Sequence, residues 1–166
     1  MTPTVKTTRM PDRSWQELGL DLLGPMPKRE YLLVLVVKLV DYFSRWVEVD
    51  VIKSATSEVI IKCLDKHFSR YGVPSTLRTD NGTNLASAEM EEYLNEMASS
   101  IDWPRANRDV ERQNRSLLKA TRAADAEMRD WRLELNKFLL AYRSTPHTTT
   151  GRSPAELLFG KKMSTK

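Results

Sequence analysis

The chain has 166 residues, of which 40% are hydrophobic and 29% charged, an ordinary composition for one globular domain with a real core. No apolar run approaches the roughly 20 residues that span a bilayer, and the polar, basic start of the chain excludes a secretory signal. A single cysteine, Cys63, excludes an internal disulfide framework, and with two histidines it is too little for a structural zinc site of His and Cys ligands. The net charge of +4 is compatible with a nucleic-acid partner but does not demonstrate one.

The first half of the chain predicts strands followed by a helix. Residues 1–14 are expected to be a disordered or trimmed leader. Residues 15–27 predict a short apolar strand that ends at a Gly-Pro turn, and residues 31–52, rich in β-branched and aromatic side chains, predict two or three antiparallel strands. Lys38 interrupts their apolar run. Residues 54–72 change to helical spacing, and Gly72 is expected to end that helix.

The second half is mostly helical by pattern. A short strand in 73–84 is expected to run into a loop, and Ser87 is a candidate N-cap for a helix over 87–97. Residues 98–106 have no clear pattern. Two long helices are expected at 107–129 and 131–144, and the capping box SPAE (153–156) predicts a last short helix that ends at Gly160. This order of elements predicts an α/β fold, a mixed sheet covered by helices.

The helix that begins near residue 107 has an unusual charge pattern. Basic side chains recur on it at spacings of three and four and form one stripe: Arg108, Arg112, Arg115, Lys119 and Arg122. Glu111 lies between this stripe and the apolar face, with Asn107 on the same flank. A basic stripe suits a phosphate backbone. The alternative is a solvated helix face on which Glu111 pairs with Arg115.

Two aspartates occur where strands are expected. Asp21 lies inside an apolar strand, where it costs several kcal/mol unless it is exposed at an edge, paired or bound to a cation. Asp80 directly follows a short strand; alone, its Asp-Asn-Gly context is typical of a turn. Together with Glu111, these residues offer three carboxylates from separate elements. Such a set can hold two Mg²⁺ ions, because Mg²⁺ prefers oxygen ligands.

Five stretches identify a family resemblance. They are WQELGLDLLGP, VDYFSRW, GVPSTLRTDNGTN, WPRANRDVERQNR and AYRSTPHTTTGRSPAELLFG. In this order they resemble the catalytic core of retroviral and gypsy-type LTR-retrotransposon integrases, over residues 15–160, with 161–166 left as a tail. The resemblance implies an RNase H-like fold, a five-stranded mixed sheet flanked by helices.

The same resemblance implies a function and a set of site residues. It implies a DDE triad of Asp21, Asp80 and Glu111, with two Mg²⁺ or Mn²⁺ ions, for 3′-end processing and strand transfer of element DNA into target DNA. Asn107 and Arg115 correspond to DNA-contacting residues, and Asn81 and Gly82 to the active-site loop. A homo-oligomer, a dimer or higher, and nuclear localisation follow from the family and its substrate. Asp41 corresponds to a structural position.

The chain departs from the family pattern in three places. The stretch between Asp80 and Glu111 is a few residues short, around residues 98–102, where the family has a strand and a mobile loop. Arg108 replaces a usual glycine. The segment with Lys38 carries extra residues, which would turn side chains to the wrong face if the slip is odd and could be absorbed if the slip is even or forms a bulge. A non-catalytic remnant that binds nucleic acid or protein is therefore the alternative function. A bacterial-type DDE transposase shares the chemistry but not the C-terminal motif.

Overall fold

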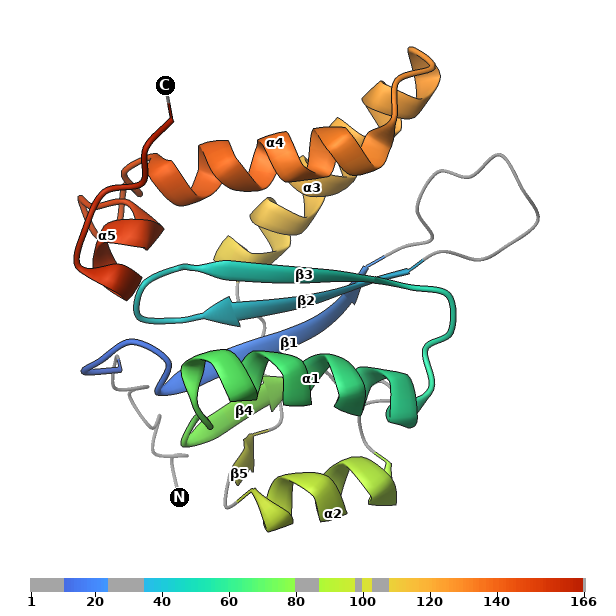
Figure 1. The fold of residues 1–166 in the computed structure, drawn as a ribbon, viewed down its shortest axis with the longest axis vertical. Helices are drawn as coiled ribbons and strands as arrows, with labels where there is room; N and C mark the ends of the chain where they lie inside the picture. The colour runs from blue at the N-terminus through green and yellow to red at the C-terminus, as the bar shows by residue number, and fades with distance from the viewer. Residues whose placement is uncertain (1–10, 24–34, 80–86, 98–99, 103–107, 166) are drawn as a thin grey trace, which may run out of the picture.

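The computed structural model of the chain describes residues 11–23, 35–79, 87–97, 100–102 and 108–165 (Figure 1). For residues 35, 36, 100–102, 108–114 and 125 it describes the backbone but not the side chain. The predicted residues Asp80, Asn81, Gly82 and Asn107 lie outside these ranges.

A mixed sheet forms the centre of the fold. Its order is β3 (Val47–Ile52), β2 (Leu35–Asp41), β1 (Glu17–Leu23), β4 (Thr76–Thr79) and β5 (Ser100–Asp102). β1 pairs antiparallel with β2 and parallel with β4, so the central strand joins an antiparallel half to a parallel half. β2 and β3 pair antiparallel, within residues 31–52, where two or three such strands were expected.

Helices cover both faces of this sheet. α1 (Ser57–Tyr71) and α2 (Ala88–Glu96) lie on one side, and α3 (Arg108–Ala126) and α4 (Trp131–Ser144) on the other (Figure 1). The short α5 (Pro154–Phe159) follows α4. In the part of the chain that the structure describes, no helix is both long and apolar enough to cross a membrane.

Strand alternation divides the core into two layers. We call the sheet surfaces the α1 face and the α3 face. On the α1 face Leu18, Leu20 and Leu39 pack with α1 and α2, and on the α3 face the cluster combines residues from β1, β2 and β3 with α3 and α4: Leu23, Val40, Val47, Leu117, Ala124, Trp131, Leu135 and Leu139. Each fully buried Leu of this kind contributes about 1.5–3 kcal/mol.

The predicted helix ends are confirmed by their caps. The hydroxyl groups of Ser87 and Ser153 accept hydrogen bonds from the first turns of α2 and α5. Gly160 ends α5 in the left-handed conformation, with φ 75°, and Gly72 ends α1. The backbone groups at a helix end lack partners within the helix and need a capping residue nearby. Helix ends can therefore be predicted from the few residues around them.

One stretch differs from expectation. Residues 98–106 have no strand pattern, yet β5 forms at Ser100–Asp102 and pairs in parallel with β4. A strand of three residues is too short to show the alternation of a strand, and each of its residues pairs with one 24 positions earlier in the sequence. The shortened region therefore retains an edge strand.

Candidate functional site

Asp21 lies on the α3 face of the central strand. Its neighbours Leu20 and Leu18 point to the α1 face, so Asp21 shares its side with Leu23, which packs against the α3 and α4 cluster. The aspartate is half-buried. Its carboxylate therefore lies on the side of the sheet that α3 covers. A partly buried charge in such a layer is costly unless a cation or a charged side chain lies next to it.

That charged neighbour is Lys38. In the antiparallel register of β1 and β2, Lys38 is the residue directly opposite Asp21, and its side chain is only 2% exposed. Burial lowers the pKa of Lys38 to about 8, because desolvation disfavours the ammonium, while the charge of Asp21 acts in the opposite direction. From the sequence, Lys38 was noted only as a break in an apolar run, and its position beside Asp21 was not predicted. The alternation of side chains in LVVKLVD could have indicated it, because it puts Lys38 on the same face of the strand as the apolar Val40.

The second predicted aspartate follows β4. β4 runs parallel to β1, and the last described pair of this ladder joins Leu20 to Thr79. Asp80 is the next residue in the chain and, with Asn81 and Gly82, lies outside the described residues.

The third predicted carboxylate is on α3. The backbone places Glu111 in the first turn of this helix, and Arg108 and Arg112 beside it, but their side chains are not described. Further along, Leu117 and Ala124 are buried in the cluster that joins α3 and α4 to the strands. Leu117 lines a small space together with Lys38, the residue opposite Asp21 in the sheet.

The outer face of α3 is basic, as its spacing predicts. Arg115, Lys119 and Arg122 are all exposed, and with Leu118 and Ala123 they line a shallow hollow of ≈ 450 Å³. We call these three residues the basic stripe. Because their charges lie on one exposed helix face, they can contact an extended anionic ligand such as a nucleic-acid backbone.

The donors that the structure describes fit a hard divalent cation only in part. Asp21 supplies an oxygen ligand of the kind that Mg²⁺ prefers. Among the described residues no three His, Cys, Asp or Glu side chains come together as a metal-binding group, and the other two predicted ligands are not among the described side chains. Lys38 opposes a cation at Asp21 by like-charge repulsion.

Asp41, the rival carboxylate, has a structural role. It is fully buried at the end of β2, where its carboxylate accepts a 2.6 Å hydrogen bond from Ser44 Oγ and another from the Phe43 amide. Burial raises the pKa of Asp41, and these hydrogen bonds lower it in part. The side chain therefore closes the β2–β3 turn and is not exposed to a ligand.

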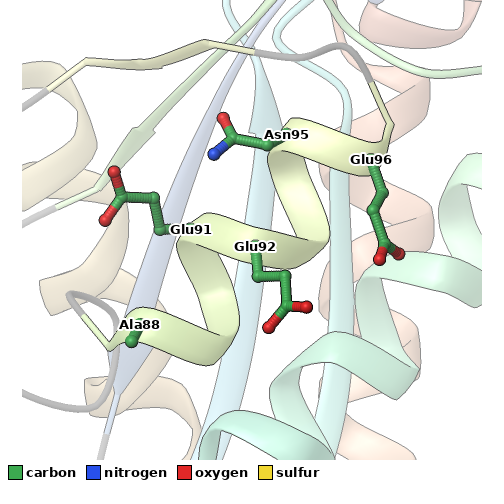
Figure 2. A pocket seen from close by; sticks show the side chains of 5 residues that line it. All are labelled: Ala88, Glu91, Glu92, Asn95 and Glu96. Carbon is green, nitrogen blue, oxygen red and sulfur yellow. The ribbon is translucent and has the colours of Figure 1, made fainter.

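An acidic hollow on α2 is not a comparable site. It is lined by Ala88, Glu91, Glu92, Asn95 and Glu96, all from one helix. Figure 2 shows that these side chains point in different directions and do not converge on one point. The hollow is an exposed, charged helix face.

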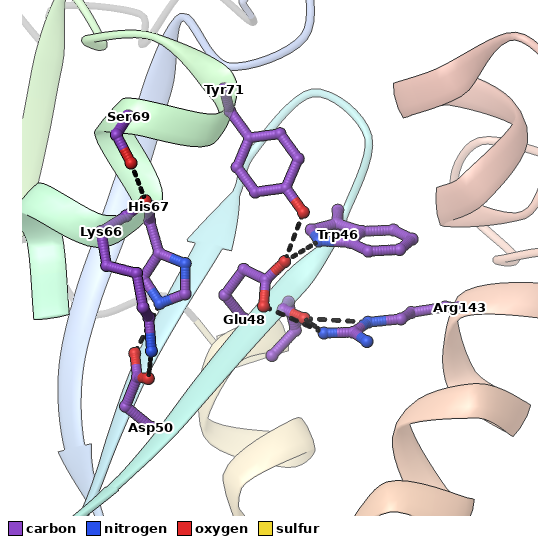
Figure 3. Close-up of polar contacts among 9 residues, drawn as sticks. Trp46, Glu48, Asp50, Lys66, His67, Ser69, Tyr71 and Arg143 are labelled. Atoms are coloured by element: carbon purple, nitrogen blue, oxygen red, sulfur yellow. Dashed lines mark hydrogen bonds and ion pairs between the residues drawn. The ribbon is translucent and has the colours of Figure 1, made fainter.

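Two further polar clusters, which the sequence did not reveal, surround the edge strand β3. Glu48 accepts hydrogen bonds from Trp46 Nε1 at 2.9 Å and Tyr71 Oη at 2.7 Å, and Arg143 of α4 lies 3.3 Å from its other oxygen (Figure 3). Arg143 also donates to the Val47 carbonyl at 2.6 Å. These contacts join α1 and α4 to the edge of the sheet from both faces.

The second cluster lies one turn away on α1. Asp50 of β3 contacts Lys66 and the buried His67 (Figure 3). Burial of Asp50 opposes its ionisation, but the hydrogen bonds from His67 and Lys66 outweigh burial and lower the pKa of Asp50. His67 is 2% exposed, so this contact lies inside the core.

Comparison with known proteins identifies the family. Residues 11–108 match the family described as Integrase core domain, and this match covers more than half of the chain. The chain is 34% identical over 162 residues to the uncharacterized protein K02A2.6 of Caenorhabditis elegans and 32% identical over 162 residues to the Gag-Pol polyprotein of feline leukemia virus. The chain therefore belongs to the integrase core domain family, as a retroviral-type integrase catalytic core.

The two matches have very unequal coverage. They include 94% and 92% of this chain, but only 12% of the Caenorhabditis elegans protein and 9% of the viral polyprotein. The chain thus spans about a tenth of the length of these relatives.

Solved structures share the fold. An intasome of simian T-cell lymphotropic virus, in complex with PP2A regulatory subunit B56 gamma, matches with a TM-score of 0.76 and 22% identity over 95% of this chain and 59% of that one. The HTLV-2 integrase catalytic core domain in complex with magnesium, in a trimeric form, matches with a TM-score of 0.70 and 21% identity over 88% of this chain and 97% of that one. The fold is accordingly that of the RNase H-like integrase cores, a mixed sheet with helices on both sides.

Proposed function

We propose that this chain is the DNA-processing core of a gypsy-type LTR-retrotransposon or retroviral integrase, a polynucleotidyl transferase that acts at DNA phosphates. The observation that carries the proposal is the position of Asp21. It is a half-buried carboxylate on the α3 face of the central strand, in a chain of the integrase core domain family. The helix packed on that face carries both Glu111 and the basic stripe.

The proposed catalytic residues are Asp21, Asp80 and Glu111. Asp80 directly follows Thr79, whose partner in the β1–β4 ladder is Leu20, the residue before Asp21. One more pair in the same register would join the two aspartates. Glu111 precedes Leu117 by less than two helical turns, about 9 Å along the axis. Leu117 itself lines the same small space as Lys38, opposite Asp21.

The three carboxylates would act in the reaction by holding two divalent ions. When bound, a pair of divalent ions supplies charge neutralisation for both the attacking and the leaving oxygen of an in-line displacement. Asp21, Asp80 and Glu111 would hold that pair. In each step the oxygen of a water or a 3′-hydroxyl gives up its proton and forms a new P–O bond, the old P–O bond breaks, and the departing oxygen takes up a proton to become a 3′-hydroxyl. No oxidant or nucleotide cofactor is needed.

The DNA would lie along α3. Its phosphates would contact Arg115, Lys119 and Arg122, which are exposed on one face of the helix. In this proposal Arg108 and Arg112 of α3, with the preceding Asn107, would extend the same interface toward the carboxylates, and Asn81 and Gly82 would belong to the active-site loop. Lysine and arginine contacts of this kind position DNA without reading its sequence.

The proposed reaction also bears on the oligomeric state of the protein and on its location in the cell. Element ends and target DNA must be held together, and the HTLV-2 integrase core is described in dimeric and trimeric forms. We therefore include a homo-oligomer, a dimer or higher, and a nuclear location in the proposal.

One observation favours a second candidate, a non-catalytic module with the same fold that binds nucleic acid or protein. Lys38 is buried directly opposite Asp21, where a positive charge opposes metal binding. In that case the basic stripe would still bind DNA, but no strand transfer would follow.

The interface is tested by binding to a fluorescent DNA duplex over a range of salt concentrations. The test variant carries Arg115→Ala, Lys119→Ala and Arg122→Ala, and the control carries Lys53→Ala, Lys62→Ala and Arg70→Ala, three exposed basic residues in or next to α1. Each lost phosphate contact reduces the slope of log K against log salt by about 0.9, so we expect a loss of roughly 2–3 in slope for the α3 variant alone. Equal affinities and slopes for the two variants would contradict the proposed interface.

A further inference from the structure

We propose that Lys38 is the built-in counter-cation of Asp21, and that a divalent metal ion reaches this carboxylate only by displacing the lysine ammonium. The inference rests on the proposed function, because it concerns the metal site in which Asp21 takes part. It assigns to Lys38 a role that controls metal affinity, and so the activity, of the whole site.

The register of the sheet brings the two residues together. Asp21 and Lys38 are direct partners in the β1–β2 ladder. Residues directly opposite each other in an antiparallel pair have Cβ atoms about 4.5–5.5 Å apart and point to the same face. Both side chains therefore enter the layer beneath α3. A lysine side chain is long enough to bring its ammonium to a carboxylate at this separation.

Lys38 is buried among uncharged side chains, so the negative charge of Asp21 stabilises its ammonium group. Lys38 is 2% exposed, and its stem packs in a space lined by Val47, Leu117, Phe138, Leu139 and Tyr142. The volume left in that space is ≈ 10 Å³, enough for at most about one water molecule. Four of the five lining residues are apolar, and the fifth, Tyr142, has no formal charge, so bulk water does not stabilise the ammonium from this side.

The ammonium and a metal ion would compete for the same carboxylate. Both are cations, and their repulsion at a separation of a few Å in a partly buried layer is stronger than in water. A divalent ion therefore reaches Asp21 only when the lysine ammonium moves away from the carboxylate. Removing the charge at position 38 should therefore raise metal affinity about tenfold or more.

The experiment measures Mn²⁺ binding by the full chain without DNA. Free Mn²⁺ is followed by electron paramagnetic resonance, and thermal unfolding is recorded on the same samples. Lys38→Met keeps the length of the side chain and suits the apolar surroundings. Lys38→Gln is a second neutral variant, in case the first does not fold. The control is Lys66→Met, which removes another lysine that contacts an aspartate, Asp50, on the α1 face.

We expect both neutral variants to bind Mn²⁺ about tenfold or more tightly than wild type, and Lys66→Met to bind as wild type does. The gain should disappear when Asp21→Asn is added. If wild type and the Lys38 variants bind Mn²⁺ equally, and Asp21→Asn weakens all of them, the inference is wrong while the metal site stands. If Asp21→Asn changes Mn²⁺ binding in no background, the metal site of the proposed function and the inference are both wrong.

Discussion

The phenol oxygen of Tyr42 lies 2.6 Å from the point at which a Cβ atom on Gly19 would be. Gly19 and Asp21 point to the same face of β1, so the tyrosine ring covers the strand next to the proposed catalytic aspartate. Arg78 of β4 in turn stacks over the Tyr42 ring, 5.4 Å from its centroid. The missing side chain at Gly19 thus allows a residue after β2 and a residue of β4 to meet across the central strand.

Gly19→Ala should lower the free energy of unfolding by about 1–3 kcal/mol, since the added methyl group overlaps the ring and an overpacked site must shift its neighbours. Urea unfolding gives this value. The control is the same substitution in a Tyr42→Leu background, where the ring is absent and the penalty should fall to well under half. A penalty that is the same with and without the ring would show that the contact does not restrict this position.

Arg143 is expected to be a main stabilising residue at the sheet edge. Arg143→Ala removes hydrogen bonds to the Val47 carbonyl and an ion pair with Glu48, whose side chain is 12% exposed. We expect a loss of about 2–4 kcal/mol in the free energy of unfolding, because a largely buried carboxylate loses its cation. Lys137→Ala on the same helix is the control. Lys137 pairs with Glu134 but is 74% exposed, so its loss should cost less than about 1 kcal/mol. Similar losses for both variants would contradict this role.

The stability of the chain should depend on Asp50 in acid. The folded-state pKa of Asp50 lies below its usual value of 3.8, so ionised Asp50 stabilises the fold at higher pH. This contribution is complete above the unfolded pKa and is lost as the pH falls through the folded one. The difference in unfolding free energy between wild type and Asp50→Asn should therefore shrink as the pH falls below about 4. A difference that grows in acid would contradict the direction of the shift.

Local features of this fold could be predicted from sequence. The N-caps Ser87 and Ser153 and the terminating residues Gly72 and Gly160 were all predicted, because each acts on backbone groups within a few residues of itself. The exposed basic stripe on α3 was predicted for the same reason, since helical periodicity fixes which side chains share a face.

Features that depend on distant partners could not be predicted in this way. β5 has three residues and exists through its pairing with β4. The burial of Lys38 follows from the register of β1 with β2 and from the packing of α3 and α4 on that face. Asp50 and His67 are 17 residues apart in sequence, and nothing local indicates that they meet. The convergence of Asp21, Asp80 and Glu111 remains a prediction.

The proposed function requires Asp21, Asp80 and Glu111 together for strand transfer. The most direct measurement is the joining of a fluorescent duplex with a free 3′-hydroxyl end to plasmid DNA, in the presence of Mn²⁺. It uses wild type, Lys38→Met and Lys38→Met with Glu111→Gln. We predict joined product from the first two, more from Lys38→Met, and at least about a hundredfold less when Glu111→Gln is added. Folded, DNA-binding chains that yield no product, or product that does not depend on Glu111, would contradict the account and favour a non-catalytic DNA-binding module.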